Sequence, residues 1–372
     1  MKLRLRAITF FLISFVIIYI YFQAKGVPTR PSIDTRLPQA SREVSTASTD
    51  ARRSFHDFHE IRSLNRTFRS HNSRNVEKAR VTNGRKGVRL HTVTYASHGG
   101  KDDRFCRGVE SSIRNGHALV VLGWGSKWRG LSQKLEAAHA YAAALPPQDV
   151  ILFCDAFDVL YVDNPGKILT RLDAMNATIL FSAECGCWPH IMENHGRACF
   201  DNYPLSPTPY RYLNSGAWVG KALNAKNMLF EVIEKAGNNF KNANDQKLVA
   251  DMFIDGRHNI SLDYHAHIFQ SMHMTLTPPL SKCDPKDDII MDDEGKWINT
   301  RTNGTPSIIH FNGGGKKYHL GMESVMWYKK KAHNSPEEKR SIQNQLLLAP
   351  SNENMGRHVK FKDICPSYFG KF

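Results

Sequence analysis

The chain has 372 residues, of which 41% are hydrophobic and 10% aromatic, enough for a sizeable core in one large domain or two ordinary ones. Its formal net charge of +15 is unevenly placed, because residues 1–90 carry +12 and the remainder only +3. A near-neutral body behind a basic tail argues against a nucleic-acid enzyme.

The amino terminus predicts a membrane anchor. Residues 7–24 form a run of 18 residues without charge, and basic residues at positions 2, 4 and 6 precede it. The run is slightly shorter than the ~20 residues of a typical span, but thin endomembranes accept short helices. A cleaved signal peptide is the alternative, although no clear small-x-small site follows. The basic flank predicts a single-pass anchor over residues 1–24, with the rest of the chain in the lumen of the endoplasmic reticulum or Golgi.

Residues 25–86 are rich in Ser, Thr, Arg, Asn and Pro and predict a flexible basic stem. Two further features agree with a lumenal location. Seven cysteines allow disulfides in an oxidising compartment, and the odd count leaves at least one thiol free or paired between chains. Sequons, which accept N-linked glycans in secreted proteins, begin at Asn65, Asn176, Asn259 and Asn303.

From residue 87 onwards, apolar β-rich runs alternate with helical patterns. This alternation predicts an α/β fold with a doubly wound, mostly parallel sheet. Neither the glycine fingerprint of dinucleotide-binding folds nor a P-loop is present. The expected strands cover residues 88–95, 118–123, 150–153 and 177–183, and the expected helices cover 105–115, 133–145 and 165–175.

Two carboxylates, Asp155 and Asp158, follow the buried strand expected at residues 150–153. Open α/β sheets bind their ligands at the carboxyl ends of strands. A pair of carboxylates at such a place suits a hard divalent cation such as Mg²⁺ or Mn²⁺. Taken alone, these residues fit equally well a strand end capped by solvated acids.

Other polar segments also follow expected strands or begin expected helices. Glu184 comes directly after a strand, with Trp188 close by, and residues 242–246 place an acid and an amide at the start of a helix. Residues 211–220 are interpreted as a turn-rich polar loop that enters an apolar segment, and residues 262–270 alternate like one strand. Each segment has a plain structural alternative, such as a core tryptophan or a helix cap.

Residues 308–316 end a short apolar strand with a histidine, three glycines and Lys316. Glycines let backbone N–H groups approach a phosphate, which Lys316 would neutralise, although a flexible turn is the alternative. Residues 321–372 form a carboxyl-terminal extension without an assigned function. Within it, residues 327–348 are expected to be helical, and Cys365 is expected to tie the tail down.

With these segments in place, residues 89–316 resemble the glycosyltransferase domain of the multifunctional procollagen lysyl hydroxylases. Several motifs match in order and spacing, and together they are far more specific than a lone pair of aspartates. The matching motifs are Thr92-Val93, Gly123-Trp-Gly-Ser-Lys-Trp-Arg-Gly130, Asp155-Ala-Phe-Asp-Val159, Ser182-Ala-Glu-Cys-Gly-Cys-Trp-Pro189, Arg211-Tyr-Leu-Asn-Ser-Gly216, Asp245-Gln246, Leu262-Asp263, Ile268-Phe-Gln270 and His310-Phe-Asn-Gly313.

The resemblance implies a single GT-A-like catalytic domain over residues 87–320, a UDP-glucose or UDP-galactose donor, and a Mn²⁺ ion. It also implies a role for each matching residue. Asp155, Asp158 and His310 resemble the metal ligands, and Thr94, Tyr95, Trp128 and Phe157 resemble the residues that hold uridine. Lys134 and Lys316 resemble the residues near the diphosphate, and Asn312 and Gly313 are expected to be further residues of the donor site. Glu184, Trp188 and Asp245 resemble the catalytic and acceptor side.

Two departures from the family pattern are visible. The family's long acidic run is reduced to Asn242-Ala-Asn-Asp245, so an auxiliary acid is expected to be missing. Too little chain follows Lys316 for the hydroxylase domain, which predicts a stand-alone transferase.

The resemblance suggests glucosyl transfer with retention onto galactosyl-hydroxylysine, or galactosyl transfer onto hydroxylysine, on a protein such as a collagen-like chain. The metal and Lys316 would stabilise the leaving diphosphate, while Asp245 or Glu184 would steady the anomeric centre or activate the acceptor hydroxyl. Two other classes stay open. A metal-dependent phosphoesterase uses similar acids and a histidine, and a UDP-binding module with weak turnover would account for the reduced acidic run.

Overall fold

The computed structural model describes residues 87–193, 196–237, 243–275, 283–350 and 356–369. The expected anchor over residues 1–24 and the expected stem over residues 25–86 lie outside this part of the chain. Among the described residues, no helix is both long and apolar enough to cross a membrane.

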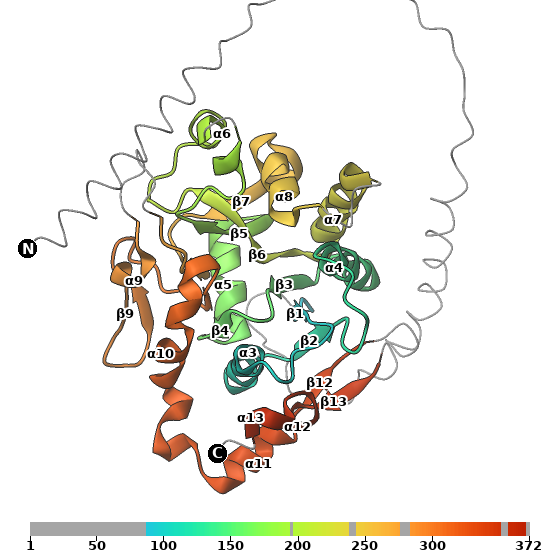
Figure 1. Ribbon diagram of the computed structural model, residues 1–372, viewed down its shortest axis with the longest axis vertical. Coiled ribbons are helices and arrows are strands. Elements are labelled where there is room, and N and C mark those ends of the chain that lie inside the picture. Colours follow the sequence, from blue (N-terminus) through green and yellow to red (C-terminus); the bar gives the residue numbers. More distant parts are fainter. Residues whose placement is uncertain (1–86, 194–195, 238–242, 276–282, 351–355, 370–372) are drawn as a thin grey trace, which may run out of the picture. The chain divides into compact units, whose positions relative to one another are not determined.

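A mixed eight-stranded sheet organises the described residues (Figure 1). In chain order its strands are β1 (Leu90–Tyr95), β2 (Leu119–Leu122), β3 (Val150–Cys154), β5 (Ile179–Glu184), β6 (Tyr212–Lys221), β7 (Ile260–Asp263), β12 (Leu346–Leu348) and β13 (His358–Lys360). Across the sheet the order is β13-β12-β2-β1-β3-β6-β5-β7. The pairs from β12 to β3 and the pair β5–β7 are parallel, whereas β6 is antiparallel to both of its neighbours and β13 is antiparallel to β12.

Helices cover both faces of this sheet. The longest are α3 (Asp103–Arg114), α4 (Ser132–Ala144), α5 (Pro165–Met175), α7 (Ala222–Ala236) and α8 (Asp245–Ile254). Alternate residues of β3 point to opposite faces: Ile151 and Phe153 pack with side chains of α4 and α7, whereas Leu152 and Cys154 pack with α3 and α5. The doubly wound α/β class is therefore confirmed. The sheet is parallel-rich, as expected, because four of its seven strand pairs are parallel.

A second sheet of three strands brings distant segments together. The sequence did not predict β4 (Val159–Tyr161), which pairs antiparallel with β11 (Ile308–His310), and β11 pairs in parallel with β8 (Phe269–Ser271). In this register His310 lies opposite Val159, and the backbone N–H of Phe311 donates to the carbonyl of Asp158 at 2.7 Å. The end of β11 is thereby held beside the acidic loop that follows β3.

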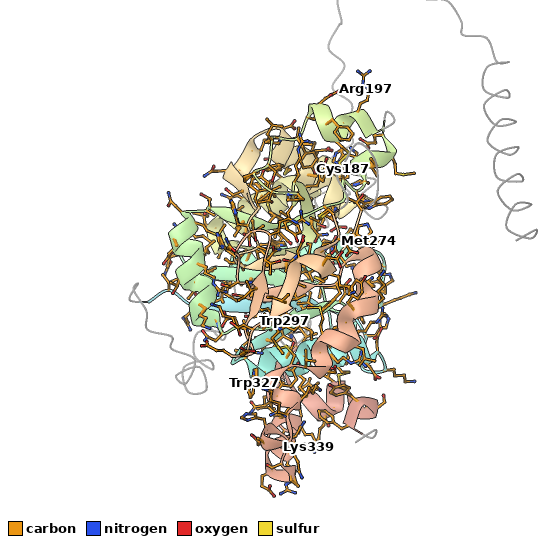
Figure 2. All side chains as sticks on the ribbon, turned by 90° about the vertical axis from the view of Figure 1, so that its left-hand side faces the viewer. Cys187, Arg197, Met274, Trp297, Trp327 and Lys339 are labelled. Carbon is orange, nitrogen blue, oxygen red and sulfur yellow. A yellow bond between two sulfur atoms is a disulfide. The ribbon has the colours of Figure 1, made fainter. Side chains whose placement is uncertain are left out.

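A third apolar cluster supports this small sheet. Trp297, labelled in Figure 2, packs in it with Leu160 of β4 and Ile309 of β11. Trp297 belongs to a hairpin, and its indole N–H lies 3.4 Å from the sulfur of Met326. The elements around this cluster are α9 (Pro285–Asp288), β9 (Ile289–Met291), β10 (Trp297–Asn299), a 3₁₀ turn at Gly313–Tyr318, and α10 (His319–Ser324). The short helix α6 (Arg197–Asp201) instead packs through Cys199 in the cluster that holds α4 and α7.

The expected polar loop over residues 211–220 is wrong. These residues form β6, whose first nine residues, from Tyr212 to Gly220, are buried. Polar residues are tolerated in this buried strand because their side chains have partners there. Asn214 donates to Glu184 at 3.0 Å, and Ser215 donates to Asp245 at 2.8 Å.

The expected single strand over residues 262–270 is also wrong, because it is split into β7 and β8, which belong to different sheets. The carboxylate of Asp263 causes the break. It accepts the backbone N–H groups of His267, Ile268 and Phe269 at 2.9, 2.7 and 2.9 Å. Such side-chain bonds to the backbone compete with ladder pairing and stabilise a turn instead.

The carboxyl-terminal extension is part of the fold. The helix expected over residues 327–348 is wrong, because this stretch holds two 3₁₀ turns (Trp327–Lys329 and Lys331–His333), α11 (Pro336–Gln343) and β12. A capping box between Ser335 and Glu338 begins α11. The tail then adds α12 (Phe361–Ile364) and α13 (Pro366–Phe369).

Three disulfides pair six of the seven cysteines: Cys106–Cys365, Cys185–Cys283 and Cys187–Cys199. The first confirms that Cys365 ties the tail down. Cys154 lies buried at the end of β3 and forms no disulfide, so the odd cysteine is a free thiol.

Candidate active site

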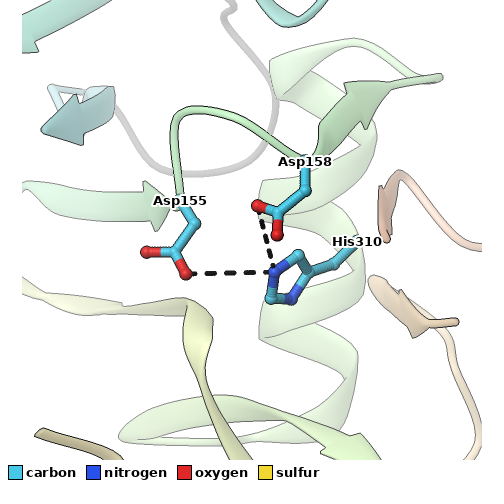
Figure 3. Close-up of side chains that lie close together, drawn as sticks. All are labelled: Asp155, Asp158 and His310. Atoms are coloured by element: carbon cyan, nitrogen blue, oxygen red, sulfur yellow. Dashed lines mark ion pairs between the residues drawn. The ribbon is translucent and has the colours of Figure 1, made fainter. Parts of the chain in front are cut away.

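Asp155, Asp158 and His310 meet in one place, although 152 residues separate the last two in sequence (Figure 3). Nε2 of His310 lies 3.5 Å from Oδ1 of Asp158 and 3.9 Å from Oδ2 of Asp155. One ligand atom from each of the three residues lies within 4.8 Å of the others. The predicted metal ligands therefore share one small volume.

The backbone of Gly216 makes room for this triad. Its carbonyl accepts the N–H of Asp155 at 2.7 Å, which fixes the start of the acidic loop against β6. A Cβ atom at Gly216 would overlap the ring of His310 and would come within 2.6 Å of Oδ2 of Asp155. Only a residue without a side chain leaves the space between the three side chains open.

The chemistry of this donor set fits a divalent cation. The side chain of His310 is buried, and neither ring nitrogen makes a hydrogen bond within the described part of the chain. A buried polar atom without such a bond is costly unless another partner satisfies it. Two carboxylates and one imidazole suit Mn²⁺ or a similar ion. Although burial opposes ionisation, His310 and Lys316 lower the pKa of Asp158 to about 2, so this carboxylate is charged at neutral pH.

Two lysines flank the triad. Nζ of Lys134 lies 3.2 Å from Asp155 and 2.8 Å from Asp245, and Nζ of Lys316 lies 3.4 Å from Asp158. Burial works against the charge of Lys134, but the two carboxylates raise its pKa above the ordinary value. Lys134 is thus fixed between two acids, whereas the side chain of Lys316 keeps 46% of its surface exposed.

Glu184 is held at the end of β5 by three side-chain amides. Its two oxygens accept hydrogen bonds from Asn214 at 3.0 Å, Gln246 at 2.8 Å and Asn312 at 2.7 Å. Burial raises the pKa of Glu184 to about 7 even though these donors favour the carboxylate. With its oxygens occupied in this way, Glu184 orients the amides around it. Gln246 also donates to the backbone carbonyl of Trp188 at 2.8 Å.

Asp245 begins α8, behind the N-cap residue Asn244. The amides at a helix start favour a negative charge there. Although burial opposes ionisation, Lys134 and the hydroxyl of Ser215 lower the pKa of Asp245. Asp245 is therefore a charged carboxylate near the Asp155–Asp158–His310 triad. Its environment differs from that of Glu184, which keeps its proton to higher pH.

These groups line one cleft of about 410 Å³. Ten of the fourteen site residues predicted from the sequence line this cleft: Asp155, Asp158, His310, Glu184, Trp188, Asp245, Lys134, Asn312, Gly313 and Lys316. The metal, diphosphate and acceptor sides of the expected site are thus brought together. Among these residues the ring of Trp188 is half-exposed, and Leu131 is a further apolar lining side chain.

The four residues expected to hold uridine do not line this cleft. Phe157 lines a second, larger cleft of about 800 Å³. Thr94 and Tyr95 are buried in β1, and Tyr95 packs so closely under Gly123 that a Cβ atom there would overlap its ring. Trp128 is 46% exposed, with its ring centroid 6.1 Å from that of Tyr95.

Sequence reasoning missed His273, which lines the first cleft two residues after β8. Its Nδ1 accepts the backbone N–H of Gly314 at 3.1 Å, so the neutral ring carries its proton on Nε2. The N–H of Gly315 donates to the carbonyl of Asn312 at 2.9 Å. The N–H groups of Gly314 and Gly315, two of the three glycines expected to approach a phosphate, therefore donate hydrogen bonds to other protein groups.

The sequence profile of the PLOD GT domain matches residues 86–337, more than half of the chain. The chain belongs to this family of glycosyltransferase domains. It is 29% identical over 227 residues to a procollagen-lysine,2-oxoglutarate 5-dioxygenase of Drosophila melanogaster, covering 57% of this chain and 29% of that protein. It is 27% identical over 210 residues to the human multifunctional procollagen lysine hydroxylase and glycosyltransferase LH3. This match covers 55% of this chain and 25% of that protein.

The resemblance inferred from the sequence is thus confirmed, and so is the enzyme class of glycosyltransferase. The chain spans less than a third of the length of these two relatives. Among solved structures, the WbbM bifunctional glycosyltransferase is 12% identical with a TM-score of 0.37, covering 69% of this chain and 52% of that one. This TM-score is too low to show a shared fold. The GT-A-like expectation therefore rests on family membership and on the α/β sheet itself.

Gly216→Ala is expected to weaken Mn²⁺ binding about 10- to 100-fold, because the new methyl group would displace His310 from the two carboxylates. Calorimetric titration of the metal-free protein with Mn²⁺ measures this. Gly321→Ala is the matched control, because a Cβ atom at that position meets no atom within 4 Å. Unchanged Mn²⁺ affinity in Gly216→Ala would contradict the proposed ligand geometry.

Glu184→Gln is expected to flatten the pH dependence of stability in the presence of a chelator. An acid whose pKa rises from 4.5 to about 7 on folding binds its proton more tightly in the folded state. That proton stabilises the fold fully below pH 4.5, and its contribution, ~3 kcal/mol, is lost as the pH rises through 7.

Urea unfolding between pH 4 and pH 8 measures the difference between the two proteins. The variant is expected to be less stable at low pH, because its amide N–H group would face the donor Asn312. Parallel curves for the two proteins across this range would show that Glu184 does not titrate there.

Proposed function

We propose that this protein transfers a hexose from UDP-glucose or UDP-galactose to a hydroxyl group on a protein or glycan acceptor, with the help of Mn²⁺. One observation carries the proposal: two carboxylates and the buried, unbonded ring of His310 share one cleft with two lysines. Family membership supports the same reaction class.

The chemical problem is the negative charge that grows on the UDP leaving group as the sugar–phosphate bond breaks. Asp155, Asp158 and His310 would hold the metal ion, which would supply positive charge to the diphosphate when bound. Lys316 is the second source of positive charge. Because its side chain is half-exposed and its contact with Asp158 is long, at 3.4 Å, it is free to turn toward a phosphate.

The two remaining acids have different tasks in this proposal. Asp245 is ionised and faces the cleft, so it would stabilise positive charge at the anomeric carbon or accept the proton of the acceptor hydroxyl. Glu184 would act by holding Asn214, Gln246 and Asn312 in place. Lys134 keeps Asp245 and Asp155 at a fixed separation and lowers their mutual repulsion.

The acceptor is the part of the proposal that depends most on the relatives. Two of them carry procollagen lysine in their names, so we propose hydroxylysine, or a sugar already attached to it, on a collagen-like chain. The stereochemical expectation is retention for glucosyl transfer. Three disulfides support an oxidising compartment, in agreement with a lumenal location in the endoplasmic reticulum or Golgi.

A UDP-release assay across several UDP-sugars, with Mn²⁺ and with or without a collagenous acceptor, tests the proposal. The double variant Asp155→Asn with Asp158→Asn is expected to lose turnover by more than about 100-fold, because the diphosphate loses its counter-charge. Asp293→Asn, an exposed acid outside the cleft, is the control.

Metal-stimulated UDP release by the double variant at the rate of the unchanged protein would refute the metal assignment. Phosphate release that needs neither uridine nor acceptor would favour a phosphoesterase. UDP binding without any sugar release from any donor would favour a binding module.

Trp188→Ala is expected to raise the KM for the acceptor about tenfold while leaving UDP affinity unchanged. Its half-exposed ring offers an apolar face at the cleft, and its backbone bond to Gln246 survives the substitution. Trp327→Ala, which removes an exposed ring outside the cleft, is the control. Equal acceptor KM values in the two variants would place the acceptor elsewhere.

A further inference from the structure

A second cleft of about 800 Å³ lies on the other side of the acidic loop. Asp155 and Asp158 line the first cleft, whereas Phe157, which lies between them in sequence, lines the second. Ser97 and Trp124, from the segments that follow β1 and β2, also line it. In open α/β sheets ligands bind outside the carboxyl ends of strands where the strand order reverses. Here β1 has β2 on one side and β3 on the other.

The carboxyl-terminal tail forms another wall of this second cleft, through Asp363, Ile364 and Pro366. The tail is firmly seated there. Its α12 buries Phe361 and Ile364 in the same apolar cluster as α3. The Cys106–Cys365 disulfide joins the tail to α3.

Two polar contacts and one close approach fix the tail against α3 and the loop that follows β1. The hydroxyl of Ser367 donates to the carbonyl of Gly100 at 3.3 Å, and the hydroxyl of Tyr368 donates to Glu110 of α3 at 2.7 Å. At Gly100 the loop approaches the tail so closely that a Cβ atom would overlap the carbonyl oxygen of Ile364. The tail is therefore held in place at the cleft by packing, hydrogen bonds and a disulfide.

The shape and chemistry of the second cleft suit a nucleoside. Trp124 and Phe157 pack against the same ring, that of Phe105, with centroids 5.6 and 5.8 Å away. They give the cleft aromatic surface suited to a base. Asp363, which lines the same cleft, is exposed and carries a carboxylate, which only accepts hydrogen bonds when ionised. Ribose hydroxyls and the imide N–H of uracil are donors.

We propose that the disulfide-anchored tail completes the nucleoside part of the donor site, with Asp363 accepting a hydrogen bond from the ribose or the base. The inference rests on the proposed function, because it assumes a UDP-sugar whose diphosphate reaches the first cleft past the acidic loop. Nothing in the family match assigns this role, because that match ends at residue 337.

The test compares Asp363→Ala with Lys362→Ala, its neighbour in α12, which is exposed but does not line the cleft. Titration calorimetry with Mn²⁺ present measures the affinity of each protein for UDP and for inorganic pyrophosphate. Asp363→Ala is expected to bind UDP about tenfold more weakly and pyrophosphate equally well, since it removes one hydrogen bond to a charged acceptor. Lys362→Ala is expected to match the unchanged protein for both ligands.

The two ligands separate a role in nucleoside binding from general damage to the site, which would weaken both. UDP affinity in Asp363→Ala equal to that of the unchanged protein would overturn the inference and leave the proposed function standing. An unchanged protein that binds neither ligand would overturn both.

The double variant Cys106→Ser with Cys365→Ser tests the anchoring of the wall. It is expected to lose UDP affinity and keep pyrophosphate affinity, because the tail would no longer be held against α3. The control removes the Cys187–Cys199 disulfide, whose cysteines do not line the second cleft. Full UDP affinity in the first variant would show that the disulfide does not hold a functional wall.

Discussion

The whole candidate site depends on the pairing of β4 with β11. β4 begins directly after Asp158, and β11 ends at His310, so one short antiparallel ladder fixes the distance between an acid and an imidazole from distant parts of the chain. Three residues per strand are few, but the strands also pack into a buried cluster around Trp297. The ladder thus obtains from packing the rigidity that its hydrogen bonds alone would not give.

The rigid site brings several negative charges close together, and two lysines reduce the repulsion between them. Asp155, Asp158 and Asp245 all line one cleft, and each lies within 3.4 Å of a lysine. The two lysines differ in freedom. Lys134 has a side-chain exposure of only 11% and contacts two acids, so it holds them in place. Lys316 is half-exposed and contacts one acid. Lys316 is therefore the lysine that can move with the smaller loss of contacts.

The sequence predicted which residues gather in one cleft better than it predicted the local structure around them. Asp155, Glu184 and Asp245 could be found because a carboxylate at a strand end or helix start stands out against an apolar run. Asn214 and Ser215 were assigned to a loop because polar residues rarely occupy buried strands, and only tertiary partners explain them. Thr94 and Tyr95 lie in a strand buried on both faces, where the alternating pattern does not show which side faces a ligand. His273 carried no local signal, since its role comes from its contact with Gly314.

The boundary of the family match and the boundary of the fold are different. The match ends at residue 337, yet Leu348 of β12 pairs with Val120 of β2, and the red segments of Figure 1 continue the sheet past that strand. Leu347, Phe361 and Ile364 are buried in the cluster that also holds α3 and α5. Residues beyond the match are therefore needed to cover apolar surface on the domain itself. A tail that packs this way is held rigidly enough to shape the neighbouring cleft that it lines.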